Sequence, residues 1–168
     1  MNLPRIVPIR QKFPTRPLPD PLPPLIREIE KLIDHKPIPA GSRIAITAGS
    51  RNISNYPAIL KTVAGELKKR GFRPFLLAAM GSHGGGTSEG KLKILAGHGV
   101  TEESIQAPIT STAKVTRVGD ATDGTPILVD EEAARADRIL VLNRVHPHPT
   151  FDGPIQSGLM KMLCVGLG

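Results

Sequence analysis

The sequence predicts an α/β fold in which a mostly parallel sheet is flanked by helices in Rossmann-like layers. Short apolar runs alternate along the chain with segments whose apolar residues recur at helical spacing, a pattern typical of parallel or mixed sheets. The apolar runs at 43–47, 73–80 and 138–145 are the predicted strands. Each ends in a loop rich in glycine or polar residues, where α/β proteins place their ligands.

The chain is expected to begin with an extended segment that leads into a helix. Residues 1–21 are rich in proline, which disfavours regular structure, although the apolar run at 6–9 could add a short edge strand. From Leu22 the leucines and isoleucines recur at i, i+3, i+4 and i+7 spacing, which predicts an amphipathic helix over 22–34.

A second helix is predicted over 56–70, between the first two strands. Polar residues at 52–55 can cap its start, and Pro57 fits its first turn. Three basic residues at 68–70 suit the negative end of the helix dipole, and Gly71 suits the position after the last turn.

The second half of the chain alternates shorter elements. Thr87 can cap a helix that ends near Gly97. The pair Asp123-Gly124 predicts a hairpin turn between short β segments within 107–129. A short helix is expected at 131–136. The continuously apolar run that follows predicts a buried strand over 138–145.

Composition limits the class of protein. With 168 residues, one cysteine and no run of 18 apolar residues, the chain is expected to be one cytoplasmic domain without a disulfide or a membrane span. Cys164 is expected to be a small core residue. The apolar pattern from Ile155 to Gly168 has no polar tail, so we expect a longer protein to continue.

The net charge of +7 favours an anionic ligand over nucleic acid. The basic residues are scattered, and aromatic residues, which stack on bases, make up 3% of the chain. The first explanation of the net charge is an uneven charge distribution in one domain of a larger protein, and a site for anionic ligands is the second. We therefore expect neither a nucleic-acid nor a membrane partner.

Three loops after predicted strands are expected to line one site: 48–51, 81–87 and 144–148. The carboxyl ends of parallel strands meet at one edge of a sheet, which brings such loops together. His83 at its strand end can act as a general acid or base. Arg51 can bind a carboxylate or phosphate through two hydrogen bonds.

Further candidates lie in and around these loops. Backbone N–H groups of Gly84, Gly85 and Gly86, followed by a helix start, could form an anion cradle. Lys161 lies in an apolar stretch, and a desolvated lysine is a competent nucleophile or covalent anchor. His35 and His98, at predicted helix ends, are expected to be structural.

The histidines at 146 and 148 are harder to assign. In an extended stretch their side chains point to opposite sides, so one of them is expected to face the site. Asp152 is near enough in the sequence to orient an imidazole. A simple metal hydrolase or lyase that uses His146, His148 and Asp152 is an open alternative.

Four short patches, in this order, resemble the nickel-pincer-nucleotide-dependent lactate racemase family. Residues 48–51 (AGSR) are similar to the family's D-x-T-R, and 80–83 (MGSH) to its T-G-T-H. Residues 147–148 are similar to its P-H, and 157–161 (SGLMK) to its S-G-G-x-K. The resemblance covers roughly residues 20–168, and it implies the N-terminal domain of a two-domain isomerase.

The resemblance also implies a function for these positions. The cofactor would be a nickel-pincer nucleotide, attached through a thioamide to Lys161, with Ser157 and Gly158 in the same cofactor-binding motif. His83 and His148 would act in turn as general bases on the hydroxyl of a small 2-hydroxy acid. Arg51 would position the anionic substrate or a cofactor phosphate. The reaction would be racemisation by hydride transfer to the cofactor and back.

The chain departs from the family pattern in ways that affect this interpretation. Ala48 replaces the family's aspartate and Leu159 its second glycine, and a short insertion precedes Lys161. The family's nickel-ligating histidine and its C-terminal domain would follow Gly168. The fragment is therefore expected to be inactive alone, as a divergent member. A non-catalytic nucleotide- or phosphate-binding domain is the alternative.

Overall fold

The computed structural model describes residues 7–10, 12, 18–35, 37–51, 53–146, 150, 153 and 156–168. Its main sheet contains four parallel strands in the order β3-β2-β1-β6. These strands are β1 (Arg43–Ala48), β2 (Arg73–Ala78), β3 (Ile109–Thr110) and β6 (Arg138–Leu140). The mostly parallel α/β sheet predicted from the sequence is confirmed.

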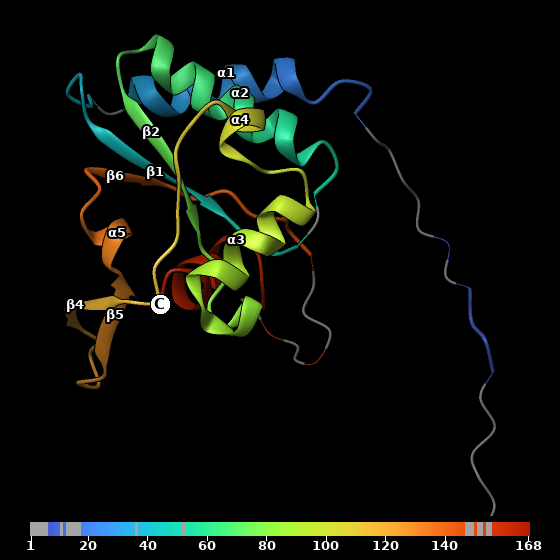
Figure 1. The fold of residues 1–168 in the computed structure, drawn as a ribbon, viewed down its shortest axis with the longest axis vertical. Helices are drawn as coiled ribbons and strands as arrows, with labels where there is room; N and C mark the ends of the chain where they lie inside the picture. The colour runs from blue at the N-terminus through green and yellow to red at the C-terminus, as the bar shows by residue number, and fades with distance from the viewer. Residues whose placement is uncertain are drawn as a thin grey trace, which may run out of the picture.

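Helices connect the strands and cover the sheet. The helices are α1 (Leu22–His35), α2 (Tyr56–Lys69), α3 (Ser88–Gly97), α4 (Glu102–Ile105), α5 (Glu131–Ala134) and α6 (Leu159–Lys161). A 3₁₀ turn, η1 (His83–Gly86), follows β2, and a π-helical turn, η2 (Met162–Gly166), continues α6. Figure 1 shows α1, α2 and α4 on one side of the sheet and the C-terminal segment on the other.

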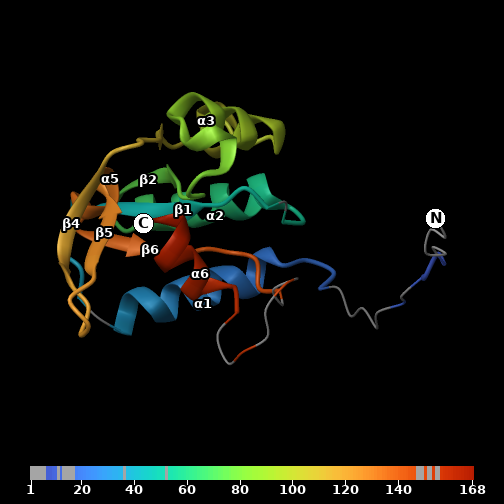
Figure 2. The ribbon, with the colours of Figure 1, turned by 90° about the horizontal axis from the view of Figure 1, so that it is seen from below.

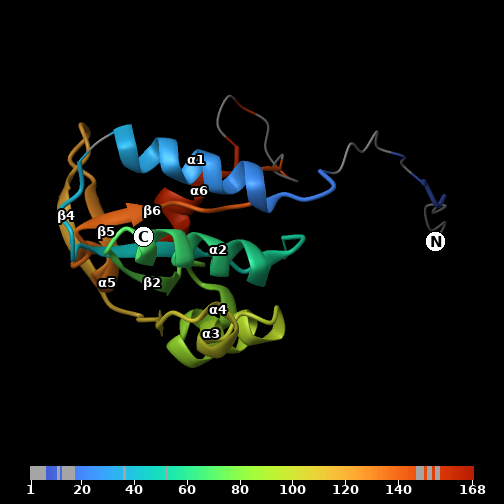
Figure 3. The same cartoon turned by 90° about the horizontal axis from the view of Figure 1, so that it is seen from above.

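A two-stranded antiparallel hairpin stands beside the main sheet. It consists of β4 (Val115–Asp120) and β5 (Pro126–Asp130), and the predicted turn at Asp123-Gly124 joins them. Figures 2 and 3 show the hairpin across one end of the sheet, with α1 on the β6 side of β1 and α3 on the β2 side. The hairpin leads directly into α5, whose first N–H groups are capped by Asp130.

The sheet has an apolar core on each face because successive side chains of a strand point to opposite sides. Ile44, Ile46 and Leu76 face α1, α2 and α4, where Leu60 and Leu67 are fully buried. The opposite face buries a second cluster with α5 and the C-terminal segment: Ala45, Phe75, Leu77, Ala79, Ala133, Met162 and Leu167. Within the described ranges, every helix is too short or too polar to cross a bilayer.

The predicted helices agree with the structure, and one capping prediction is wrong. Pro57 lies in the first turn of α2, and Gly71, with φ of 79°, follows its end. Asn55, however, adopts a left-handed conformation and its side chain caps nothing. An asparagine tolerates this backbone conformation, so Asn55 turns the chain into the helix instead of capping it. Asn52 lies outside the described residues.

Three sequence-based expectations about apolar residues are wrong. Residues 7–10 form no strand, and Val7 and Ile9 are exposed. Cys164, in η2, is exposed and is not a core residue. The strand predicted over 138–145 ends at Leu140, and its first two residues are exposed. Among the described strands, β6 pairs with β1 alone and forms an edge of the sheet, which leaves it partly exposed. An apolar run in the sequence does not reveal this position.

Beyond the end of β6, the chain is bonded to β1 through the Thr47 side-chain hydroxyl. The Leu142 N–H donates to Thr47 Oγ1 over 2.8 Å, and the Thr47 hydroxyl donates to the Leu142 carbonyl over 3.0 Å. Thr47 is fully buried near the end of β1. These two bonds hold the chain after β6 against β1, and that chain carries the third strand-end loop.

We predict that Thr47→Val will release this loop. The variant keeps the side-chain shape but removes the hydroxyl that pairs with the part-buried N–H and carbonyl of Leu142, which costs about 1–3 kcal/mol of unfolding free energy. Amide hydrogen exchange at Leu142 should become faster. Thr47→Ser is the control that keeps the hydroxyl and should keep this amide protected. Equal protection in both variants would contradict the assignment.

Candidate functional site

The candidate site is a pocket of about 180 Å³ at the carboxyl ends of β1 and β2. The loops after β1, β2 and β6 form part of its wall, as the sequence predicts, and the C-terminal segment forms the rest. Arg51, His83, Ser157 and Lys161 all line it, although they lie up to 110 positions apart. His146 lines it as well.

Three residues expected at the site are not among the described residues that line the pocket. Gly158 does not line the pocket but starts α6, which carries Lys161. The Asn143 side-chain amide donates to its carbonyl over 2.7 Å and so joins the β6 loop to the lysine helix. His148 and Asp152 lie outside the described residues.

The glycine loop has a structural role that its sequence did not reveal. Gly84, Gly85 and Gly86 have φ between 65° and 71°, and none of them lines the pocket. A side chain at Gly84 would lie 2.4 Å from the backbone of Gly90, so glycine here allows η1 to pack directly on α3. The loop thus fixes His83 at the strand end, and the structure gives no support to an anion cradle on these three glycines.

The loop after β1 is held from both sides. The Gly49 N–H donates to Tyr56 Oη over 2.9 Å, and the Ser50 carbonyl accepts a hydrogen bond from His98 Nε2 over 3.0 Å. Burial raises the pKa of the Tyr56 phenol to about 12, although the Gly49 contact lowers it in part. His98 is structural, as predicted, and its partner is the carbonyl of a pocket residue. Ala48, at the end of β1, is fully buried in the core.

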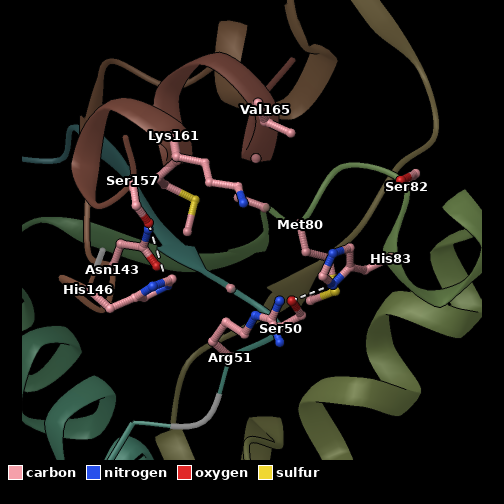
Figure 4. Close-up of a pocket in the computed structure, with 14 residues that line it drawn as sticks. Ser50, Arg51, Met80, Ser82, His83, Asn143, His146, Ser157, Lys161 and Val165 are labelled. Carbon is pink, nitrogen blue, oxygen red and sulfur yellow. Dashed lines mark hydrogen bonds between the residues drawn. The ribbon is translucent and has the colours of Figure 1, made fainter. Parts of the chain in front are cut away.

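Ser50 and His83 are joined across the two strand-end loops. Ser50 Oγ lies 2.5 Å from His83 Nδ1, and Figure 4 shows this pair on one side of the pocket. On the other side lie Asn143, His146 and Ser157, where Ser157 Oγ and His146 Nε2 are 3.5 Å apart. The sequence patches contained Ser50, but nothing in their spacing identified it as the partner of His83.

The C-terminal segment packs closely on the strand ends. Met162 and Leu167 are buried, and the Asp130 N–H donates to the Leu167 carbonyl over 2.5 Å. A side chain at Gly81 would lie 2.6 Å from the Val165 carbonyl, and one at Gly166 would lie 3.0 Å from the Ala79 carbonyl. This close packing places η2 over the pocket and points the Lys161 side chain into it (Figure 4).

The pocket is positively charged. Lys161 is half-buried, Arg51 is exposed, and neither has a hydrogen-bond or ion-pair partner among the described residues. No aspartate or glutamate is among the described residues that line it. The described part of the chain also contains no group of three metal-ligating side chains. The arrangement therefore suits an anionic ligand, because a carboxylate or phosphate could pair with both cations.

Comparison with known families agrees with this geometry. The model of the lactate racemase N-terminal domain matches residues 22–154, which is most of the chain. The chain belongs to the lactate racemase N-terminal domain family. Searches of curated proteins and of solved structures return no significant match.

The match to the lactate racemase N-terminal domain covers one part of the pocket. Arg51, His83 and His146 lie inside the matched residues, whereas Ser157 and Lys161 follow them. The family match therefore does not include Ser157 and Lys161. Their place in the site is supported by the structure, in which they line the same pocket. The contacts made by Asn143, Tyr56 and His98 were missed because they join residues without a shared motif.

We predict that Gly81→Ala will disturb the packing of η2. Gly81 has φ of 55°, and the new methyl group would also meet the Val165 carbonyl. Gly85→Ala is a matched control, since Gly85 has φ of 70° and no atom near its added methyl group. Both lose about 1–2 kcal/mol to backbone strain. Gly81→Ala should lose about 1–3 kcal/mol more by urea denaturation, and an equal loss would contradict the close packing.

We predict that Tyr56 will ionise near pH 12 in the folded protein. It is the chain's single tyrosine, and there is no tryptophan, so its absorbance change can be followed directly. The folded pKa of about 12 lies above the ordinary value of 10.0. The unfolded state therefore loses its proton first, and the free energy of unfolding should fall as pH rises from about 10 to about 12. A midpoint near 10 would indicate an exposed phenol.

Proposed function

We propose that this chain is the N-terminal domain of an isomerase that racemises or epimerises small 2-hydroxy acids with a nickel-pincer nucleotide. The observation that carries the proposal is the meeting of Lys161, Arg51 and His83 in one pocket of a lactate racemase N-terminal domain. An anchor, an anion-binding group and a base are three parts that such a reaction needs. We further propose that it works in the cytoplasm and that a C-terminal domain completes the site.

The described residues fit one end of this cofactor. The Lys161 amine reaches into the cavity without a partner among the described residues, as an attachment point requires. The cavity of about 180 Å³ is smaller than ordinary ligand pockets of roughly 300–1,000 Å³, so these residues would surround one end of a nucleotide. When bound, the nickel-pincer nucleotide would supply the group that accepts a hydride and returns it.

The chain's own residues have distinct roles in this proposal. Arg51 binds the substrate carboxylate through its guanidinium and so fixes which carbon faces the cofactor. His83 takes the proton of the 2-hydroxyl group of one enantiomer, and gives a proton to that oxygen when the reaction runs from the other enantiomer. His148 is proposed as the second base, because each enantiomer needs a base on its own side. Gly158 precedes α6 and accepts a hydrogen bond from Asn143, which helps to position Lys161, and Ser157 in the pocket wall is proposed to contact the cofactor.

We predict that Lys161 will carry a covalent adduct when the protein is produced with the enzymes that synthesise the cofactor. Peptide mass spectrometry should find the added mass at Lys161, and the protein should interconvert the enantiomers of a 2-hydroxy acid. Lys161→Ala should lose both the adduct and the activity. Lys93→Ala, at an exposed position on α3, is the control that should keep both.

Arg51→Gln tests the substrate contact in the same protein. Loss of a charge-assisted bond of about 1.5–3 kcal/mol should raise KM for the 2-hydroxy acid roughly 10–150-fold while the adduct remains. An unmodified Lys161 together with no racemisation would refute the proposed function. Calorimetric binding of a nucleotide under those conditions would favour the non-catalytic alternative, which also needs the two cations.

A further inference from the structure

We propose that Ser50 is the positioning residue for His83: its hydroxyl accepts the imidazole Nδ1–H and thereby directs the Nε2 lone pair into the pocket. The bond joins two loops that follow neighbouring parallel strands, β1 and β2, and it spans 2.5 Å between Ser50 Oγ and His83 Nδ1. The role of His83 as a base rests on the proposed function, whereas the hydrogen bond does not.

Ser50 is suited to position another residue because its own place is fixed. Its carbonyl accepts the Nε2–H of His98 from the end of α3, and the preceding N–H, that of Gly49, is held by the buried Tyr56. A serine held on both sides presents its hydroxyl at a defined point. The opposite loop is also fixed, because the His83 N–H donates to the Met80 carbonyl and Gly84 packs against Gly90.

The direction of the bond determines which ring nitrogen of His83 can act as a base. A neutral imidazole carries one N–H, and the partner of one ring nitrogen determines which nitrogen keeps its lone pair. If Nδ1 donates to Ser50, Nε2 is an acceptor and can take a proton from a substrate hydroxyl. If Ser50 donates instead, Nε2 carries the hydrogen and cannot act as a base.

A hydroxyl performs this task here because the described pocket has no carboxylate to do it. No acidic side chain is among the described lining residues, and Ala48 is buried in the core away from the pocket. A serine orients the ring without adding negative charge. The positive character of the pocket is thus preserved for the ligand, whose anionic group pairs with Arg51 and Lys161.

The direction of the bond can be measured without cofactor or activity. Nitrogen-15 NMR of the histidine side chains distinguishes a protonated ring nitrogen from one with a free lone pair. His83→Gln identifies the His83 signals by their loss. We expect the proton of His83 on Nδ1. A proton on Nε2 in the parent protein overturns the proposal.

Two variants then separate positioning from structure. Ser50→Ala should abolish the preference for Nδ1–H at His83, whereas Ser50→Thr, which keeps the hydroxyl, should retain it. The signals of His98 are an internal control, because His98 contacts the backbone carbonyl of Ser50 and should not change in either variant. An unchanged His83 tautomer in Ser50→Ala, or a lost preference in Ser50→Thr, overturns the proposal.

Kinetics of the cofactor-loaded protein supply a second readout. Ser50→Ala should lower kcat on the order of tenfold with little change in KM, a smaller loss than the roughly 10²–10⁴-fold that a general base contributes. An unchanged kcat overturns the positioning role. If the protein racemises no 2-hydroxy acid and Lys161 is unmodified, the proposed function fails, while the NMR result still decides the Ser50–His83 bond.

Discussion

The candidate site depends on the close packing of the η2 turn against the ends of β1 and β2. Met162 and Leu167 are buried on one face of the sheet, and burying each such side chain contributes about 1.5–3 kcal/mol. Glycine at 81 and 166 lets the two backbones approach within contact distance. Because Lys161 precedes this turn directly, the packing that stabilises the segment also points the lysine into the pocket.

Hydroxyl groups do much of the positioning around this pocket. Thr47 holds the chain after β6, Tyr56 holds the Gly49 N–H, and Ser50 contacts His83. Hydroxyls can accept and donate hydrogen bonds without a formal charge, so they order three loops and add no net charge to the pocket. The consequence is a pocket whose formal charges come from Arg51 and Lys161, among the described residues.

The sequence predicted those parts that depend on local pattern. Helical spacing located α1 and α2, and the alternation of elements indicated which loops share an edge of the sheet. The prediction failed where a contact with a residue distant in the sequence determines the local structure. The apolar run after Arg138 predicts a buried strand. In the structure the strand ends at Leu140, and the Leu142 N–H donates to the Thr47 hydroxyl. The three consecutive glycines predicted a ligand-binding loop. In the structure, Gly84 must be a glycine because a side chain there would meet the backbone of Gly90.

The same distinction applies to the site. Arg51, His83 and Lys161 were identifiable because their chemistry is unusual for their surroundings in the sequence. The residues that orient them were not, since Ser50 and Asn143 are ordinary until a distant partner is known. A pairing such as Ser50 with His83 spans 33 positions and two strands, and no spacing rule predicts it.

The charge of the pocket favours an anionic ligand. Arg51 and Lys161 both line the cavity of about 180 Å³, and no acidic side chain is among the described residues that line it. An anion bound between Arg51 and Lys161 would pair with both charges, and because it would bind the folded state it would also stabilise the fold. The two cations therefore favour a carboxylate or phosphate within reach of His83, which lines the same pocket.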